Sequence, residues 1–223
     1  MRQEALFEVA AWIDGVQMCR PLRVAIDGRT ASGKTIFADE ITAELEALGR
    51  TVIRTSIDGF HRTRAERYAR GRNSAEGYYY DARDLPAIRR LLLDPLGSGG
   101  DLSYRTASFD LHADIPIDAP PTQAGVRDIL IVDGTFLQRP ELRDAWDVIV
   151  FMDVDAAIAV DRGVSRDSKH LGGQAAAAAL FRDRYAAAYE IYDRVSDPLR
   201  HAHIVIDNRD FAGASARLVR PLQ

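Results

Sequence analysis

The sequence predicts an α/β fold in which a parallel five-stranded sheet is flanked by helices. Two observations predict it. Short apolar runs alternate along the chain with stretches of helical periodicity, and the first apolar run breaks into a glycine-bounded loop just before a helix. Strands that alternate with helices form parallel sheets that helices cover on both faces. Such sheets bind their ligands at the carboxyl ends of the strands, so we expect a functional site along that edge.

The predicted strands are apolar runs without a polar face, which is the pattern of strands buried on both sides. They cover Arg23–Asp27, Thr51–Ile57, Ile129–Asp133, Val148–Asp153 and Ile204–Asp207. The first helix is predicted over Lys34–Leu48, because apolar residues recur on one face and Gly49 follows its end. Another helix is predicted over Leu85–Leu93, where Pro86 occupies the first turn.

Three stretches interrupt this alternation. Residues 58–80 are rich in arginine and tyrosine, residues 94–126 are rich in Gly, Pro and Asp, and residues 162–185 lead into an alanine-rich helix. Irregular segments this long in a compact α/β domain are usually functional or mobile. We therefore expect a single domain over residues 1–223, with two mobile loops and a lid segment over residues 162–185.

The composition is that of a soluble globular protein. Of the 223 residues, 47% are hydrophobic and 28% are charged, and the net charge is −4. These values exclude the disordered and fibrous classes, and the negative balance argues against a protein that coats nucleic acid. The longest small-apolar run, Ala175–Phe181, is too short to cross a bilayer. We expect no nucleic-acid partner and no membrane partner, and we leave the oligomeric state open.

The N-terminal stretch has no basic region followed by a hydrophobic segment and a cleavage site, so we expect no export signal and a cytoplasmic location. Cys19 is the single cysteine in the sequence. It excludes an internal disulfide and a cysteine-built metal site, and its simplest interpretation is a small hydrophobic residue.

One octapeptide matches the phosphate-binding pattern G-x-x-x-x-G-K-[ST] at every fixed position, between a predicted strand and a predicted helix. Its residues are Gly28, Arg29, Thr30, Ala31, Ser32, Gly33, Lys34 and Thr35. Backbone N–H groups of such a loop point at phosphate oxygens, and the positive end of the following helix faces the same place. Lys34 then reaches the β and γ phosphates, and Thr35 binds Mg²⁺. The sequence thus predicts a P-loop NTPase fold that binds ATP and Mg²⁺. This interpretation is preferred to the alternative, a glycine loop that only turns the chain.

A triphosphate site alone does not identify a reaction. GTPase switches need an Asn-Lys-x-Asp motif, which this sequence lacks; the nearest string is Asn208-Arg209-Asp210. A motor or a helicase normally carries more modules than 223 residues supply. A small-molecule kinase and an ATP-gated regulator remain.

Three strand ends supply carboxylates for a kinase, which needs one to take a proton from the acceptor and another to hold Mg²⁺. Asp58, Asp133 and Asp153 all follow predicted strands and should share one rim of the sheet with the P-loop. Gly134 lets the backbone turn near a ligand after Asp133, whereas Asp153 runs into a predicted helix and is open to a capping role. We predict Asp133 as the metal-side acid, with Asp153 as the alternative. Asp58 is either an acceptor-side carboxylate or a turn-forming residue.

The chain resembles the uridine kinase and phosphoribulokinase group of P-loop kinases. Besides the P-loop, the resemblance rests on Ser56-Ile57-Asp58-Gly59-Phe60, Tyr80-Asp81, Tyr104, Val132-Asp133-Gly134, Arg162 and Arg166-Asp167. It covers most of residues 20–208. It implies a phosphotransferase that moves the γ-phosphoryl group of ATP to an alcohol group of a nucleoside or sugar-like acceptor, as a uridine kinase does.

The resemblance also implies roles for individual residues. Asp58 is the general base, Asp81 holds sugar hydroxyls, and Asp133 supports Mg²⁺. The lid contains Arg162 and Arg166, whose spacing of four places both on one helix face, suited to phosphate oxygens. The expected catalytic residues are Asp58, Lys34 and Arg166; Arg162 joins the ATP site; and Asp81, Tyr104, Tyr80 and His61 are the acceptor-side candidates. Tyr78, Tyr79 and Tyr80 are expected either to line an acceptor pocket with their rings or to pack against the sheet. For His61 the alternative is an exposed loop position.

Two features depart from the group's pattern. Uridine-cytidine kinases carry a base-reading histidine five residues after the tyrosine that Tyr104 matches, and here that position is Phe109. Lid arginines of the group fall on Leu171 and Gly173. Lys169, Arg182 and Arg184 are the alternative sources of the lid's transition-state charge.

An arginine cluster near Asp58 supplies a further alternative for the acceptor. It comprises Arg62, Arg64, Arg67, Arg70 and Arg72. Guanidinium groups suit carboxylates and phosphates, so an acidic or already phosphorylated metabolite is an alternative, alongside a solvated loop or a nucleic-acid contact. A regulatory P-loop protein with slow ATP hydrolysis is the rival from another class. It needs no acceptor base, so the role of Asp58 distinguishes the two.

Overall fold

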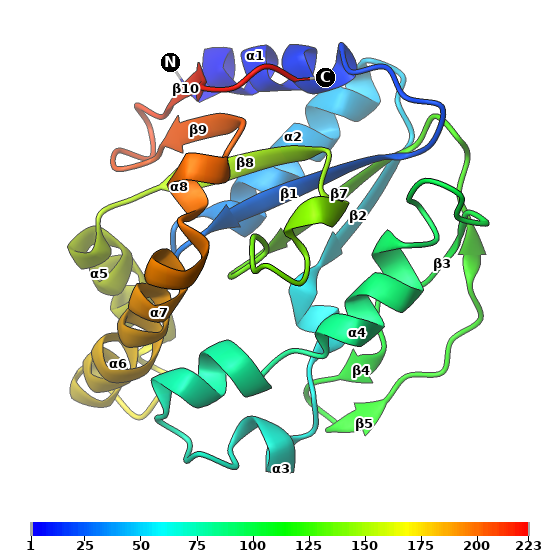
Figure 1. Cartoon of the computed structure of the whole chain (residues 1–223). Helices are drawn as coiled ribbons and strands as arrows, with labels where there is room; N and C mark the ends of the chain where they lie inside the picture. The colour runs from blue at the N-terminus through cyan, green and yellow to red at the C-terminus, as the bar shows by residue number, and fades with distance from the viewer. Residues whose placement is uncertain (1, 223) are drawn as a thin grey trace.

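The structure, a computed structural model, describes residues 2–222. Its centre is a sheet with the strand order β10-β9-β8-β1-β7-β2 (Figure 1). The strands are β1 (Leu22–Gly28), β2 (Val52–Ser56), β7 (Ile129–Gly134), β8 (Val148–Asp153), β9 (Ile204–Asp207) and β10 (Ser215–Leu218). β1, β2, β7, β8 and β9 run parallel, which confirms the predicted five-stranded parallel sheet.

β10 extends the sheet beyond that prediction. It pairs antiparallel with β9 at the edge of the sheet, where Ser215 lies opposite Asp207. Its side chains are mostly exposed, and it lacks the continuous apolar run of the inner strands, which are covered on both faces.

Helices cover both faces of the sheet, as the alternation of strands and helices predicts (Figure 1). On one face, α1 (Arg2–Asp14) and α2 (Lys34–Ala47) pack against Val24 and Ile26 of β1. On the other face, α4 (Leu85–Ile88) and the π-helical turn η3 (Arg89–Leu93) pack near Ala25. Successive residues of β1 thus enter opposite cores, which is the period of a doubly buried strand.

The two helices expected from periodicity are both present. α2 matches the predicted helix Lys34–Leu48 to within one residue, and Gly49 follows it with a φ of +83°. The predicted helix Leu85–Leu93 is α4 followed directly by η3. At its start the Asp84 side chain accepts a hydrogen bond from the Ala87 N–H. α1 was not predicted.

The three interrupting stretches contain short elements. Residues 58–80 include most of η1 (Ile57–Phe60), α3 (Arg64–Arg67) and most of η2 (Gly77–Asp81). Residues 94–126 form two small ribbons, β3 (Ser103–Tyr104) with β6 (Thr122–Gln123) and β4 (Phe109–Asp110) with β5 (Ile115–Pro116). Residues 162–185 span the end of α5 (Ala156–Asp167), α6 (Gln174–Leu180) and η5 (Phe181–Ala186). The chain continues through α7 (Ala187–Ser196) and α8 (Pro198–His201), and η4 (Arg143–Ala145) precedes β8.

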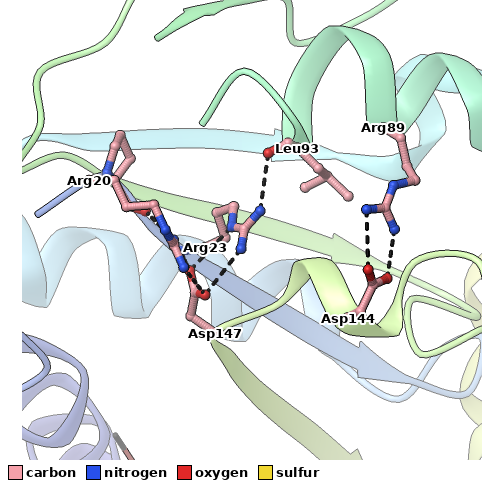
Figure 2. Close-up of polar contacts among 7 residues, drawn as sticks. Arg20, Arg23, Arg89, Leu93, Asp144 and Asp147 are labelled. Carbon is pink, nitrogen blue, oxygen red and sulfur yellow. Dashed lines mark hydrogen bonds and ion pairs between the residues drawn. The ribbon is translucent and has the colours of Figure 1, made fainter. Parts of the chain in front are cut away.

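A polar network fastens the amino end of β1 (Figure 2). Arg20 and Arg23 both donate to the carboxylate of Asp147, and Arg23 also donates to the Leu93 carbonyl at the end of η3. Although burial opposes ionisation of Asp147, the hydrogen bonds from Arg20 and Arg23 hold its pKa below the usual range. The network therefore joins β1, the start of β8 and η3 through one buried carboxylate.

Candidate active site

The P-loop joins the carboxyl end of β1 to α2, as predicted. Gly33, the N-cap of α2, has a φ of +90°, and a Cβ there would lie 2.6 Å from Nδ2 of Asn208. That amide donates to the Ser32 carbonyl at 2.8 Å, so it supports the loop from behind. No side chain within residues 2–222 caps the first turn of α2, and the buried Oγ of Ser32 has no partner there. These free donors suit phosphate oxygens.

Lys34 lies almost fully inside the loop. Its Nζ donates to the Arg29 carbonyl at 2.6 Å. Burial lowers the pKa of Lys34 to about 8, although the charges of Asp27 and Asp133 act in the opposite direction. Lys34 is therefore still largely protonated at neutral pH and can face an anionic ligand.

The structure brings the two predicted magnesium ligands together. Thr35 Oγ1 donates to Asp133 Oδ2 at 2.7 Å, and Asp133 Oδ1 lies 2.8 Å from Nη1 of Arg54. A hydroxyl and a carboxylate are oxygen donors that fit Mg²⁺, which takes its remaining ligands from water and phosphate. Asp153, the alternative acid, is exposed and does not line the cavity next to Lys34.

Asp58 is the second residue of η1, the short 3₁₀ turn that follows β2, and is fixed by Arg83. Nη2 of Arg83 donates to Asp58 Oδ1 at 2.6 Å. Withdrawal from water opposes ionisation of Asp58, but the nearby charges of Arg83 and Lys34 hold its pKa below the usual range. Its side chain keeps 63% of its surface exposed, so an acceptor can reach it.

His61 supports the same pair. Its Nδ1 lies 2.8 Å from the Asp58 carbonyl, and its Nε2 lies 2.5 Å from Nη1 of Arg83. A carbonyl can only accept and a guanidinium can only donate, so the ring is neutral with its proton on Nδ1. Burial and the Arg83 charge lower the pKa of His61 to about 4. Both ring nitrogens are thus already engaged, by Asp58 and by Arg83, and His61 also lines a cavity on the acceptor side.

One cavity of about 190 Å³ brings together half of the predicted site residues. Its lining includes Thr30, Ala31, Gly33, Lys34, Thr35, Asp58, Asp133 and Arg166. Tyr78 also lines it, and so does Arg83, which the sequence analysis did not single out. The phosphate loop, the magnesium-side pair and the candidate base therefore face one space.

Three predicted acceptor-side residues lie outside this cavity. Tyr104 is buried in the core beneath η3, because its pairing with Thr122 turns the ring inward. Asp81 accepts a hydrogen bond from Nε of Arg70 at 2.7 Å. Tyr80 is exposed beside Tyr79. None of the three lines the cavities that contain Asp58 within residues 2–222.

Helical rotation explains the tyrosines. In η2, three successive tyrosines point in three directions, since neighbouring side chains on a helix diverge. Tyr78 faces the cavity, Tyr79 is buried against Phe136 and Tyr192, and Tyr80 faces solvent. Of the three tyrosines expected either to line a pocket or to pack against the sheet, Tyr78 lines this cavity.

The lid arginines divide between two places. Arg162 donates to the carbonyls of Asn208 and Arg209, both at 2.9 Å, so it holds the loop behind the P-loop. Arg166, one turn later on α5, lines the cavity and pairs with Asp167. Of the three alternative sources of lid charge, Lys169 and Arg182 are exposed. Arg184 is buried and lines a second cavity, which adjoins the first on the acceptor side.

A buried carboxylate beneath the P-loop also escaped the sequence analysis. Asp27, the residue before Gly28, accepts hydrogen bonds from the Tyr192 hydroxyl and from Nε2 of Gln138. Burial raises the pKa of Asp27. An aspartate inside an apolar, doubly buried strand was the available signal, whereas Arg83 stands in a charged stretch and has no distinguishing spacing.

The fold and this cavity define a P-loop kinase: a parallel sheet flanked by helices, a phosphate loop after β1, and carboxylates at the ends of β2 and β7. The chain belongs to the phosphoribulokinase / uridine kinase family, whose model matches residues 24–210.

Individual relatives agree with that membership. The chain is 30% identical over 152 residues to a uridine kinase of Staphylococcus aureus, a match that covers 67% of this chain and 70% of the relative. It is 26% identical to uridine kinase-like protein 5 of Arabidopsis thaliana over 69% of this chain, but spans only 32% of that longer protein. A solved structure from Bacillus stearothermophilus, described as a possible uridine kinase, shares the fold with a TM-score of 0.71 at 23% identity and covers 92% of this chain and 98% of its own.

None of the helices within residues 2–222 combines the length and the apolar character that a membrane crossing requires.

Proposed function

We propose that this chain is an ATP-dependent kinase that transfers the γ-phosphoryl group to a hydroxyl group of a small-molecule acceptor. The observation that carries the proposal is the single cavity that holds Lys34, Thr35 and Asp133 together with Asp58. Phosphoryl transfer needs a phosphate cradle, a metal site and a proton acceptor in one space. The relatives' names favour a nucleoside or sugar-like acceptor, but the positions of Tyr104 and Asp81 add nothing to that identity.

The nucleotide end of the cavity would hold the triphosphate. The backbone N–H groups of the P-loop and Lys34 face the phosphates, and Arg166 adds a positive charge from the lid side. Thr35 and Asp133 would hold Mg²⁺, which neutralises phosphate charge when bound. Arg54 keeps the Asp133 carboxylate in place from the far side.

Asp58 would act as the general base at the acceptor end. Its carboxylate takes the hydroxyl proton while the acceptor oxygen bonds to the γ-phosphorus and the bond to the ADP oxygen breaks. Arg83 orients Asp58, and its charge keeps the carboxylate ionised. The products are ADP and a phosphorylated acceptor, and the proton passes from Asp58 to solvent.

The test is initial ADP release with Mg-ATP in the presence and absence of added hydroxyl compounds. Asp58→Asn keeps the shape but cannot take the proton, so kcat should fall by about 10²- to 10⁴-fold while the KM for ATP stays near its wild-type value. Asp161→Asn, on the exposed side of α5, is the matched control.

ATP consumption that never depends on an acceptor would favour the regulatory alternative. Loss of ATP binding in Asp58→Asn, with residual turnover unchanged, would show that Asp58 belongs to the nucleotide site instead.

A further inference from the structure

A second cavity of about 270 Å³ adjoins the first on the acceptor side. The two share Thr30, Asp58, Tyr78, Arg83 and Arg166 in their linings, so they lie side by side. Its volume is near the lower end of the range for ligand pockets, about 300 Å³, which suits a small metabolite and is too small for a nucleic-acid strand.

The walls of this second cavity are strongly basic. Four arginines line it, Arg67, Arg83, Arg166 and Arg184, against two carboxylates, Asp58 and Asp167. Each carboxylate already has an arginine partner, since Asp58 pairs with Arg83 and Asp167 pairs with Arg166. Arg67 and Arg184 line this cavity and not the nucleotide cavity; Arg67 pairs with Asp114, and Arg184 has no carboxylate partner within residues 2–222.

Arg67 and Arg184 are buried, and each has at least one guanidinium nitrogen without a hydrogen-bond partner in the described part of the chain. Their residues are only 4% and 7% exposed. Nε and Nη1 of Arg67 and Nε of Arg184 have no hydrogen-bond partner in the part of the chain that the structure describes. A buried guanidinium with unpaired N–H groups is unfavourable unless a ligand pairs with it.

Arg184 is the arginine of this cavity that most clearly lacks a charged partner. It makes no ion pair with any residue from 2 to 222, and its guanidinium instead lies 5.2 Å and 4.9 Å from the ring centroids of Tyr68 and Tyr78. Arg67 lies 3.1 Å from Asp114 through Nη2 alone, which leaves its other two nitrogens free. The two side chains come from α3 and η5, so the pair exists only in the folded chain.

We propose that the acceptor carries an anionic group, a carboxylate or a phosphate monoester, which Arg184 and Arg67 bind while the acceptor hydroxyl faces Asp58. The inference rests on the proposed kinase function. Planar guanidinium groups bind both kinds of oxyanion in a bidentate manner, so the same pair serves either source of charge.

The first test measures anion binding without turnover. Protein saturated with Mg²⁺ and the non-hydrolysable analogue AMP-PNP, which fills the P-loop, is titrated with inorganic phosphate by calorimetry at constant ionic strength. Wild-type protein should bind saturably. Arg184→Gln and Arg67→Gln should each weaken binding by about tenfold or more, the effect of losing a charge-assisted hydrogen bond.

Matched controls remove the same charge from exposed positions. Arg194→Gln lies further along the helical run of Arg184, and Arg64→Gln lies one turn before Arg67 on α3. Both should bind phosphate as the wild type does, and circular dichroism establishes that all four variants are folded. No saturable binding in the wild type, or equal weakening in test and control variants, overturns the proposal. Because two positions are tested, the proposal can still be refuted if one of the variants does not fold.

The second test compares acceptors that differ by one anionic group. Acceptor-dependent ADP release is measured with glycerate against glycerol, with ribulose 5-phosphate against ribulose, and with uridine. The anionic member of at least one pair should have a kcat/KM about tenfold higher or more, and the pair that responds identifies a carboxylate or a phosphate. In Arg184→Gln the acceptor KM should rise while the ATP KM stays unchanged.

The outcomes separate the two proposals. Preference for the neutral member of each pair, or efficient use of uridine, overturns the anionic acceptor and leaves the kinase function standing. Saturable phosphate binding without acceptor-dependent ADP release from any compound counts against the kinase function and leaves the anion site standing.

Discussion

Arg83 joins Asp58 and His61 into one unit at the scale of single residues. Its guanidinium donates to both side chains, and it is itself buried. The geometry fixes the protonation of both partners: Asp58 is held as an anion and His61 as a neutral ring. His61 is therefore a positioning residue in the proposed mechanism.

A pH experiment tests the neutral state of His61. Its pKa is about 4 in the folded chain, below the ordinary value near 6.5, so the unfolded chain binds this proton more tightly. The stability that a neutral His61 provides is complete above about pH 6.5 and is lost as the pH falls toward 4, by about 3 kcal/mol at most. Urea unfolding between pH 4 and pH 7 measures it.

His61→Gln should remove this contribution to the pH dependence, because glutamine does not titrate. His112→Gln, at an exposed position, is the control and should keep the wild-type profile. An unchanged profile in His61→Gln would mean that the ring is not held neutral.

At the residue scale, the motif-based part of the site could be predicted and the rest could not. Lys34, Thr35 and Asp133 lie in short local patterns with fixed spacing, and the structure places them together. Arg83 and Arg184 have no such pattern; folding of distant segments selects them from several arginines that look alike in the sequence. Tyr104 was misplaced because strand pairing, which local sequence does not reveal, sets the direction of its ring.

The network at the amino end of β1 supports a prediction at the scale of elements (Figure 2). Asp147→Ala would leave Arg23 buried without its carboxylate, because only 9% of that arginine's side chain is exposed. Removing one partner of a buried ion pair costs about 3 to 5 kcal/mol. Chemical denaturation should show a loss of this size.

The neighbouring pair between Arg89 and Asp144 supplies the control. Asp144 is 70% exposed, and exposed pairs contribute at most about 1 kcal/mol, so Asp144→Ala should have a small effect. Equal losses in the two variants would contradict the view that burial makes the Asp147 network important.

The packing of α5 against η5 gives a second prediction. A Cβ at Gly163 would lie 1.9 Å from the ring of Phe181, so Gly163→Ala must push the two elements apart. Overpacking of this kind costs about 1 to 3 kcal/mol. Because α5 carries Arg162 and Arg166, the KM for ATP should rise as well. Adding Phe181→Leu should restore both stability and KM, and failure of this rescue would show that another contact is responsible.

The elements themselves were predictable where burial was complete. The inner strands are continuous apolar runs because both of their faces are covered, and each was predicted. β10 is half solvated and α1 has a mixed sequence, so neither carried a comparable signal. In both cases position in the tertiary structure decides the element.

For the whole molecule, ligand binding should be visible as stability. A nucleotide that binds only the folded chain stabilises it by about 2.7 kcal/mol at 100 times its Kd. The midpoint temperature of thermal unfolding should therefore rise when AMP-PNP is added, and the rise should become smaller when EDTA removes Mg²⁺. Thr35→Ala should lose much of the Mg²⁺-dependent part, because it removes the hydroxyl beside Asp133. If the rise in midpoint temperature is the same with EDTA and in Thr35→Ala, the assigned metal ligands are contradicted.

The orientation of β1 has a practical consequence. Arg23, near its amino end, is neutralised by Asp147, whereas the P-loop at its carboxyl end has donors left over for a ligand. Across the seven residues of this strand, a rise of about 3.3 Å per residue puts the two ends roughly 20 Å apart. Substitutions at that separation usually have additive effects. Protein engineers can therefore raise heat tolerance at one end of the strand and redesign acceptor choice at the other as two independent tasks.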